Sequence, residues 1–170
     1  MIETALKTDC SQCQGLCCAA YSFDDPDRFA IAKPVDTACP HLQNHGCSIH
    51  NTRVEQGFSG CLSYDCHGAG QRVVQDLFPG LDWRDDPALL PKMTAALRDL
   101  QKAHEAAAML FAAADLPLPD HVHKQRQDLM AQIIPDKGWT LSALQTYTQG
   151  PLPSQIRNFL RALKSHLPRP

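Results

Sequence analysis

Apolar residues in the second half of the chain recur with the period of an α-helix. Asp86 is a suitable N-cap, and Pro87, the next residue, is tolerated in the first turn of a helix. Apolar side chains then follow at spacings of three, four and seven residues, at Met93, Leu97, Leu100, Ala107 and Phe111. This spacing predicts a long amphipathic helix that ends near Asp115, before two prolines.

Three shorter helices are predicted after it, over residues 120–134, 141–148 and 154–166. Their expected capping residues are Asp120, Thr140 and Ser154. The last of them has an apolar face formed by Ile156, Phe159, Leu160, Leu163 and Leu167. Its basic residues, Arg157, Arg161 and Lys164, project from another face. Residues 85–170 are therefore expected to form a small helical bundle.

The first half of the chain has a different character. Residues 8–68 are rich in Gly, Pro, Asp, Asn and Ser and have no sustained period of 3.6 or 2, which favours loops and short turns. A short helix over residues 71–78, stopped by Pro79 and Gly80, would join the halves. The predicted fold is mainly α, with a loop-rich N-terminal cysteine cluster in residues 1–84 packed on a helical bundle in residues 85–170.

Charge and hydropathy exclude two classes of partner. Residues 1–84 carry six Lys and Arg against ten Asp and Glu, and residues 85–170 carry ten against eight, so neither half has the basic footprint of a nucleic-acid-binding protein. The N-terminus lacks an apolar run of signal-peptide length, and no stretch approaches the roughly 18 apolar residues that span a bilayer. We expect a cytoplasmic protein that binds neither nucleic acid nor membrane.

A cytoplasmic location changes the meaning of the cysteines, because reducing conditions favour metal-binding or redox-active thiols over disulfides. All eight lie within 57 residues, at Cys10, Cys13, Cys17, Cys18, Cys39, Cys47, Cys61 and Cys66. The first four form a C-x2-C-x3-C-C run, and a C-x2-C turn brings two thiolates to one ion in structural zinc sites. Mutual repulsion among so many thiolates favours a shared cation.

The ligand pairing is left open by the sequence. Eight thiols suffice for two four-coordinate sites, or for one four-thiolate cluster with thiols left over. The adjacent residues Cys17 and Cys18 are expected to serve different sites, to bridge two metals, or to include one non-ligand. Histidines interspersed among the cysteines are further candidate ligands, namely His41, His45, His50 and His67.

The cysteine order also resembles a known family. The chain is similar to the CxxCxxxCC family of zinc- or iron-chelating cysteine-cluster proteins in the run from Cys10 to Cys18, then Cys39-Pro-His-Leu, Gly-Cys47-Ser-Ile-His-x-x-Arg53 and Cys61-x4-Cys66. The resemblance covers residues 10–66, about a third of the chain. It implies metal chelation, with all eight cysteines as candidate ligands.

Ligand type alone does not select the metal, because thiolates suit zinc, iron–sulfur clusters and Cu(I). Zinc is the first choice, since metal binding would help to fold a loop-rich segment. An iron–sulfur protein in electron transfer, or as an accessory to a modifying enzyme, is the second reading, and a copper store is the third. A thiol redox switch is a further alternative. Known catalytic motifs are absent, so a structural metal module for a protein partner is favoured over an enzyme.

Overall fold

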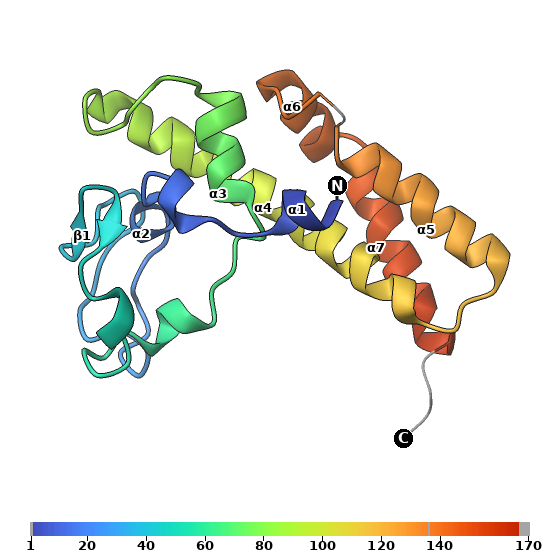
Figure 1. Cartoon of the computed structure of the whole chain (residues 1–170), viewed down its shortest axis with the longest axis horizontal. Helices are drawn as coiled ribbons and strands as arrows, with labels where there is room; N and C mark the ends of the chain where they lie inside the picture. The colour runs from blue at the N-terminus through green and yellow to red at the C-terminus, as the bar shows by residue number, and fades with distance from the viewer. Residues whose placement is uncertain (1, 136, 167–170) are drawn as a thin grey trace.

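The chain is mainly helical, and the computed structural model describes residues 2–135 and 137–166. The α-helices are α1 (Ile2–Leu6), α2 (Leu16–Ala20), α3 (Ala69–Arg72), α4 (Leu90–Ala112), α5 (Asp120–Ile133), α6 (Leu141–Gln149) and α7 (Leu152–Ala162). Two antiparallel strands, β1 (Leu42–Gln43) and β2 (Gly46–Cys47), form a short hairpin. Figure 1 shows the cysteine-rich segments at one end of α4, with α5 and α7 beside its other end.

The long helix predicted after Asp86 is confirmed. The Asp86 carboxylate accepts a hydrogen bond from the Ala88 N–H at 3.0 Å. A 3₁₀ turn over Pro87–Leu89 leads into α4, and a second 3₁₀ turn over Ala113–Asp115 closes it. The proline costs nothing here because a first-turn N–H has no partner inside the helix. Capping and periodicity thus placed this helix correctly.

The three C-terminal helices are also confirmed, but two of the three caps were wrong. Thr140 caps α6 as expected, with its hydroxyl accepting from the Ala143 N–H at 3.0 Å. Asp120 is instead the first residue of α5, preceded by Pro119, and Ser154 lies inside α7, which begins at Leu152. Both helices have proline at their start, where a missing N–H costs no helical hydrogen bond, and neither has a side-chain cap. Leu167 lies outside the described residues.

The cysteine-rich half is built from short pieces. Between α2 and α3 the described elements are the β1–β2 hairpin and two 3₁₀ turns, over His50–Thr52 and Ser59–Leu62. The helix expected at residues 71–78 begins earlier, as α3, and continues as a π-helical turn over Val73–Leu77. Such a wide turn marks a local departure from α geometry.

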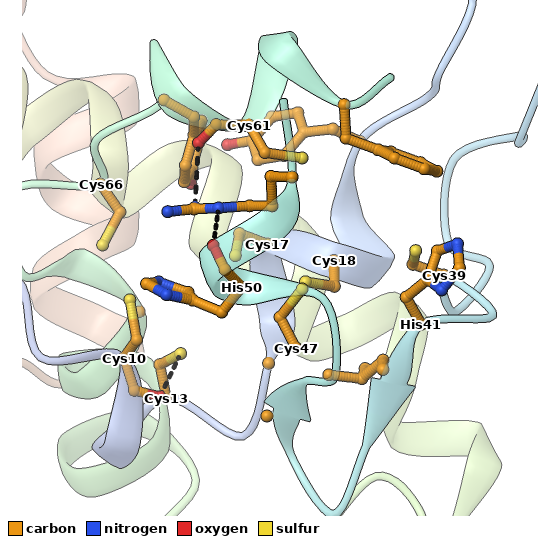
Figure 2. Close-up of a pocket in the computed structure, with 18 of the residues that line it drawn as sticks. Cys10, Cys13, Cys17, Cys18, Cys39, His41, Cys47, His50, Cys61 and Cys66 are labelled. Carbon is orange, nitrogen blue, oxygen red and sulfur yellow. Dashed lines mark hydrogen bonds between the residues drawn. The ribbon is translucent and has the colours of Figure 1, made fainter. Parts of the chain in front are cut away.

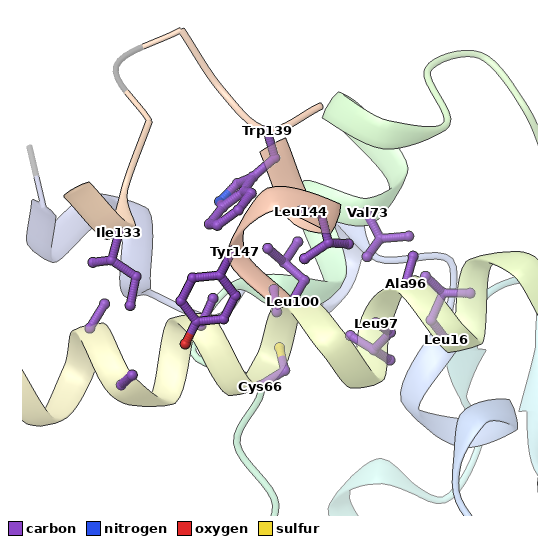
Figure 3. Packing of buried hydrophobic residues seen from close by; sticks show 14 of the residues in the cluster. Leu16, Cys66, Val73, Ala96, Leu97, Leu100, Ile133, Trp139, Leu144 and Tyr147 are labelled. Carbon is purple, nitrogen blue, oxygen red and sulfur yellow. The ribbon is translucent and has the colours of Figure 1, made fainter. Parts of the chain in front are cut away.

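One hydrophobic core joins the two halves. Leu97 and Leu100 of α4 are fully buried at its centre. Leu16 of α2 packs in the same cluster from the cysteine-rich half, and Ile133 and Leu144 pack in it from the bundle, as Figure 3 shows. The cysteine-rich half is therefore held to the bundle by apolar packing, and the division at residue 84 stays a prediction.

Phe111 is an exception to the predicted apolar stripe. Its side chain is 43% exposed, whereas Leu110 beside it is fully buried. The buried face rotates along α4, from Met93 and Leu97 near the start to Ala106 and Leu110 near the end. This happens because α2 and α3 cover the first half of α4, while α5 and α7 cover the second half from another side. A fixed stripe read from spacing cannot include that rotation.

Candidate metal-binding cavity

All eight cysteines line a single cavity of about 220 Å³. They reach it from α2, the β1–β2 hairpin, and the chain segments around residues 10–13, 39, 61 and 66. Figure 2 shows these side chains around the cavity. Each cysteine is a free thiol, and their burial ranges from the exposed Cys10 to the buried Cys13, Cys39 and Cys66. The fold thus brings together thiols that are up to 56 residues apart in the sequence.

The C-x2-C segment forms a capped turn. The Asp9 carboxylate accepts from the Ser11 N–H at 3.0 Å, which caps a 3₁₀ turn over Cys10–Gln12. The Cys13 thiol then donates to the Cys10 carbonyl at 3.3 Å. Gly15 follows in a left-handed conformation with φ of 65°, a geometry that other residues adopt only at a cost. This glycine turns the chain into α2, which carries Cys17 and Cys18.

Cys66 is held beside this segment by a threonine. The Thr8 hydroxyl lies 3.6 Å from the Cys66 sulfur, donates to the Asp65 carboxylate at 2.5 Å, and accepts from the Gly68 N–H at 3.2 Å. Gly68 has a φ of 80°, and a Cβ there would lie 2.6 Å from the Ala5 carbonyl oxygen. Glycine at this position therefore lets the N-terminal segment lie against the Cys66 turn.

The β1–β2 hairpin positions two further thiols. Leu42 pairs with Cys47 across the hairpin, and the Leu42 N–H donates to the Cys39 carbonyl at 2.9 Å. Asn44 and His45 form its two-residue turn with φ of 46° and 63°, as a type I′ turn requires. The Cys39 N–H donates in turn to the carbonyl of Cys18 at 3.0 Å. Cys18, Cys39 and Cys47 are thus connected through the backbone.

Two cations border the cavity region. Arg53 lines it, donating through Nε to the His50 carbonyl at 2.8 Å and through Nη1 to the Cys61 carbonyl at 3.5 Å. Lys33 is 5% exposed. Its ammonium donates to backbone carbonyls of Ala19, Tyr21, Pro34 and Thr37, at 2.8 Å in the last case. Lys33 was not identified from the sequence, and Arg53 was noted there only as part of the family-like run after Cys47.

The thiols differ in how readily they ionise. Burial raises the pKa of Cys13 to about 11, and it also raises the pKa of Cys39 and Cys61. The pKa of Cys18 is lowered to about 7, first because the Cys17 thiol donates a hydrogen bond to it. The positive charges of Lys33 and Arg53 lower the pKa of Cys18 further. Cys18 is thus the cysteine with the largest thiolate fraction near neutral pH among those with a resolved shift.

The candidate histidines divide into two groups. His41, His45 and His50 line the cavity. The Nε2 atom of His45 lies 3.0 Å from an Asp82 carboxylate oxygen, so it already has a partner. The His67 side chain is not part of the cavity wall, and its ring lies 3.7 Å from the Asp65 carboxylate. The structure therefore places three of the four candidates at the cavity.

His104, on the apolar stripe of α4, is a buried core histidine. Its side chain is 1% exposed, and Nδ1 donates to the His67 carbonyl at 2.6 Å. Its Nε2 has no hydrogen-bond partner among the described residues. Burial lowers the pKa of His104, so the ring is neutral at neutral pH.

The thiols lie around the wall of the cavity without meeting at one point. Among the described residues, no three side chains of His, Cys, Asp or Glu are placed closely enough to hold one ion. Also within residues 2–135 and 137–166, none of the helices has the length and apolar content that crossing a membrane requires.

Comparison with known proteins gives one relative. A Bacillus subtilis (strain 168) protein with the name "Uncharacterized protein YybG" is 36% identical over 133 residues, which cover 78% of this chain. The match covers 48% of the relative, so the chain spans about half the length of the curated relative that it matches. No family profile matches the chain, and no solved structure matches it. The resemblance to the CxxCxxxCC family stays a prediction.

Proposed function

We propose that this protein chelates metal ions through its eight cysteines in the cavity, with zinc as the favoured ion. The observation that supports the proposal is the convergence of every cysteine in the chain on one cavity. Buried cysteines are common singly in protein cores, but eight around one space form a soft ligand set that suits zinc, iron–sulfur clusters or Cu(I). The resemblance to zinc- or iron-chelating cysteine-cluster proteins agrees with this chemistry.

The architecture gives a reason for a metal at this place. The cavity walls come mainly from loops, short turns and the five-residue helix α2, with apolar packing around Phe23 and Phe58. Structural zinc binding contributes on the order of 10 kcal/mol in small domains, enough to order such loops. We propose that residues 1–84 form a metal-stabilised module packed on the helical bundle.

Binding requires two changes in the thiols. They must lose their protons, and the sulfurs must move from the cavity wall towards an ion, because three donors do not yet meet among the described residues. Burial raises the pKa of Cys13 to about 11, so a metal would displace that proton and affinity should rise with pH. Lys33 and Arg53 would offset part of the negative charge of a thiolate-rich site.

Elemental analysis tests the proposal directly. The full chain would be purified anaerobically without an affinity metal column, and its metals, sulfide and absorption spectrum measured. Bound zinc with no visible band supports the zinc reading, iron with matching sulfide selects the iron–sulfur alternative, and copper selects the third reading. No bound metal, before or after reconstitution, would refute metal chelation. His50→Ala serves as a control at the cavity, and it should leave the metal content unchanged if cysteines are the ligands.

A thiol redox switch is a second candidate, favoured by one observation. The Cys17 thiol donates to Cys18, whose pKa is lowered to about 7, and low-pKa thiols are the ones that peroxide oxidises first. In such a switch, two cysteine thiols would be oxidised to one disulfide while one hydrogen peroxide is reduced to two waters. The disulfide sulfurs would no longer bind metal, so the metal would be released. Counting thiols and released metal after mild peroxide tests this, and full retention of both would refute it.

Location and partners are also proposals. A cytoplasmic setting would keep the free thiols reduced. A protein partner would use the metal-stabilised module as a rigid surface, and neither nucleic acid nor membrane is proposed as a ligand.

A further inference from the structure

We infer that, when metal binds, the eight cysteines of the cavity form two adjacent four-thiolate sites that separate between Cys17 and Cys18, each site closing as its sulfurs move inward from the cavity wall. The first site takes Cys10, Cys13, Cys17 and Cys66, and the second takes Cys18, Cys39, Cys47 and Cys61. This inference rests on the proposed metal chelation and specifies its ligand pairing, which the sequence left open.

The first set is held together by contacts around the Cys13 and Cys66 sulfurs. A Cβ on Gly70 would lie 3.8 Å from the Cys66 sulfur and 3.9 Å from the Cys13 sulfur, so both sulfurs approach the same point of α3. The Gln71 side chain of the same helix accepts from the Asp9 N–H at 2.7 Å. The segment that carries Cys10 and Cys13 is therefore attached to α3, which follows Cys66 in the chain.

The second set is held together through the hairpin. The Cys39 N–H donates to the Cys18 carbonyl at 3.0 Å, and the hairpin fixes Cys47 through its pairing with Leu42. Arg53 then holds the carbonyl of Cys61. Figure 2 shows Cys18, Cys39 and Cys47 on one side of the cavity, with Cys10, Cys13 and Cys66 on the other side.

The geometry of α2 explains why the division falls inside one dipeptide. Successive residues of an α-helix point about 100° apart, because 3.6 residues make one turn. Cys17 and Cys18 therefore leave α2 about 100° apart, while their thiols remain close enough to share a hydrogen bond. In Figure 2 Cys17 lies between the two groups, and Cys18 lies towards Cys39 and Cys47. Adjacent cysteines on this helix can thus supply one ligand to each of two neighbouring ions.

Cadmium NMR on the intact wild-type chain tests the pairing without any substitution. The protein would be loaded with ¹¹³Cd, and each metal signal correlated with the cysteine β protons to which it couples. We expect two tetrathiolate resonances, one coupled to Cys10, Cys13, Cys17 and Cys66 and the other to the remaining four. A single resonance, a cysteine coupled to both ions, or any other grouping would overturn the two-site division.

Two double variants give an independent test. Cys13→Ser/Cys66→Ser removes two ligands of the first set, and Cys39→Ser/Cys47→Ser removes two of the second. Each variant should retain one metal per chain, and the resonance lost in one should be the resonance retained in the other. Loss of the same resonance in both would overturn the division. If the wild type binds no cadmium or zinc at all, the proposed function fails, which is a distinct result from metal binding with another grouping.

Discussion

Replacing Lys33 by methionine tests whether a buried cation organises the wall of the cavity. Methionine keeps most of the aliphatic side chain but removes the ammonium, which donates to four backbone carbonyls and lies 4.7 Å from the centre of the Phe23 ring. Hydrogen bonds to a charged donor contribute about 1.5–3 kcal/mol each, and an ammonium has three hydrogens to donate. The cost of burying the ammonium disappears in the variant, which offsets part of this loss.

We therefore expect Lys33→Met to lower the free energy of unfolding by about 2–4 kcal/mol, from the loss of charged hydrogen bonds to backbone carbonyls. Denaturant unfolding of the metal-free protein, followed by circular dichroism, measures the change. Lys92→Met is the matched control, because Lys92 is exposed on the first turn of α4, and it should change stability by less than about 0.5 kcal/mol. Equal effects of the two substitutions would refute the role assigned to Lys33.

Three further predictions concern the turn beside Cys66, a buried histidine and the metal. Gly68→Ala should destabilise by about 2–4 kcal/mol in chemical denaturation, because the new Cβ would meet the Ala5 carbonyl at 2.6 Å. Gly80→Ala is the control, because Gly80 has φ of 73° but no atom lies within 4 Å of the new Cβ, so it should cost only the backbone strain of about 1 kcal/mol. Equal losses of stability in the two variants would exclude the clash at Gly68. Burial lowers the pKa of His104 in the folded protein below the unfolded value of about 6.5. The contribution of the neutral ring to stability is therefore complete above about pH 6.5 and is lost as the pH falls from there through the folded-state pKa. His104→Gln should reduce this slope in unfolding titrations at several pH values, and an unchanged slope would contradict the assignment. After a chelator removes the metal, a protease should cleave the cysteine-rich half earlier than it cleaves helices α4 to α7. Identical cleavage with and without metal would contradict metal-dependent ordering.

The sequence predicted the C-terminal helices well because their signals are local. The Asp86 and Thr140 caps and the period of α4 each depend on residues within one or two turns. The predicted burial of Phe111 was wrong because it depends on which side of α4 is covered by α5 and α7, and that is a tertiary property. The helix starts at Leu152 and Asp120 differ from the predicted ones because these helices begin directly after proline and without a side-chain cap.

The cysteines could be identified from the sequence, but the remainder of the cavity could not. Their number and spacing predicted metal ligands in one site or two, which stays a prediction, and the structure places all eight around one cavity. Lys33 gave no signal, because its partners are backbone carbonyls, which every residue has. Thr8 and Gln71 were missed because they act across about 60 residues of chain, by contact with Cys66 and with the Asp9 N–H. Periodicity and motif spacing contain no information about such pairings.

Helix α4 connects the cavity to the bundle. Leu97 is part of the cavity lining and is also fully buried in the core, so one side chain belongs to both. Gln101, one turn further along α4, accepts a hydrogen bond from the hydroxyl of Tyr64, which lines the cavity beside Cys66. A movement of the thiols towards an ion would therefore act on the same helix against which α5, α6 and α7 pack. Because protein interiors are close-packed, such a displacement is transmitted to neighbouring side chains instead of being absorbed locally. Under the proposed metal chelation, a shift of Leu97 or Gln101 on metal loading would therefore change the packing of α4 against α5, α6 and α7.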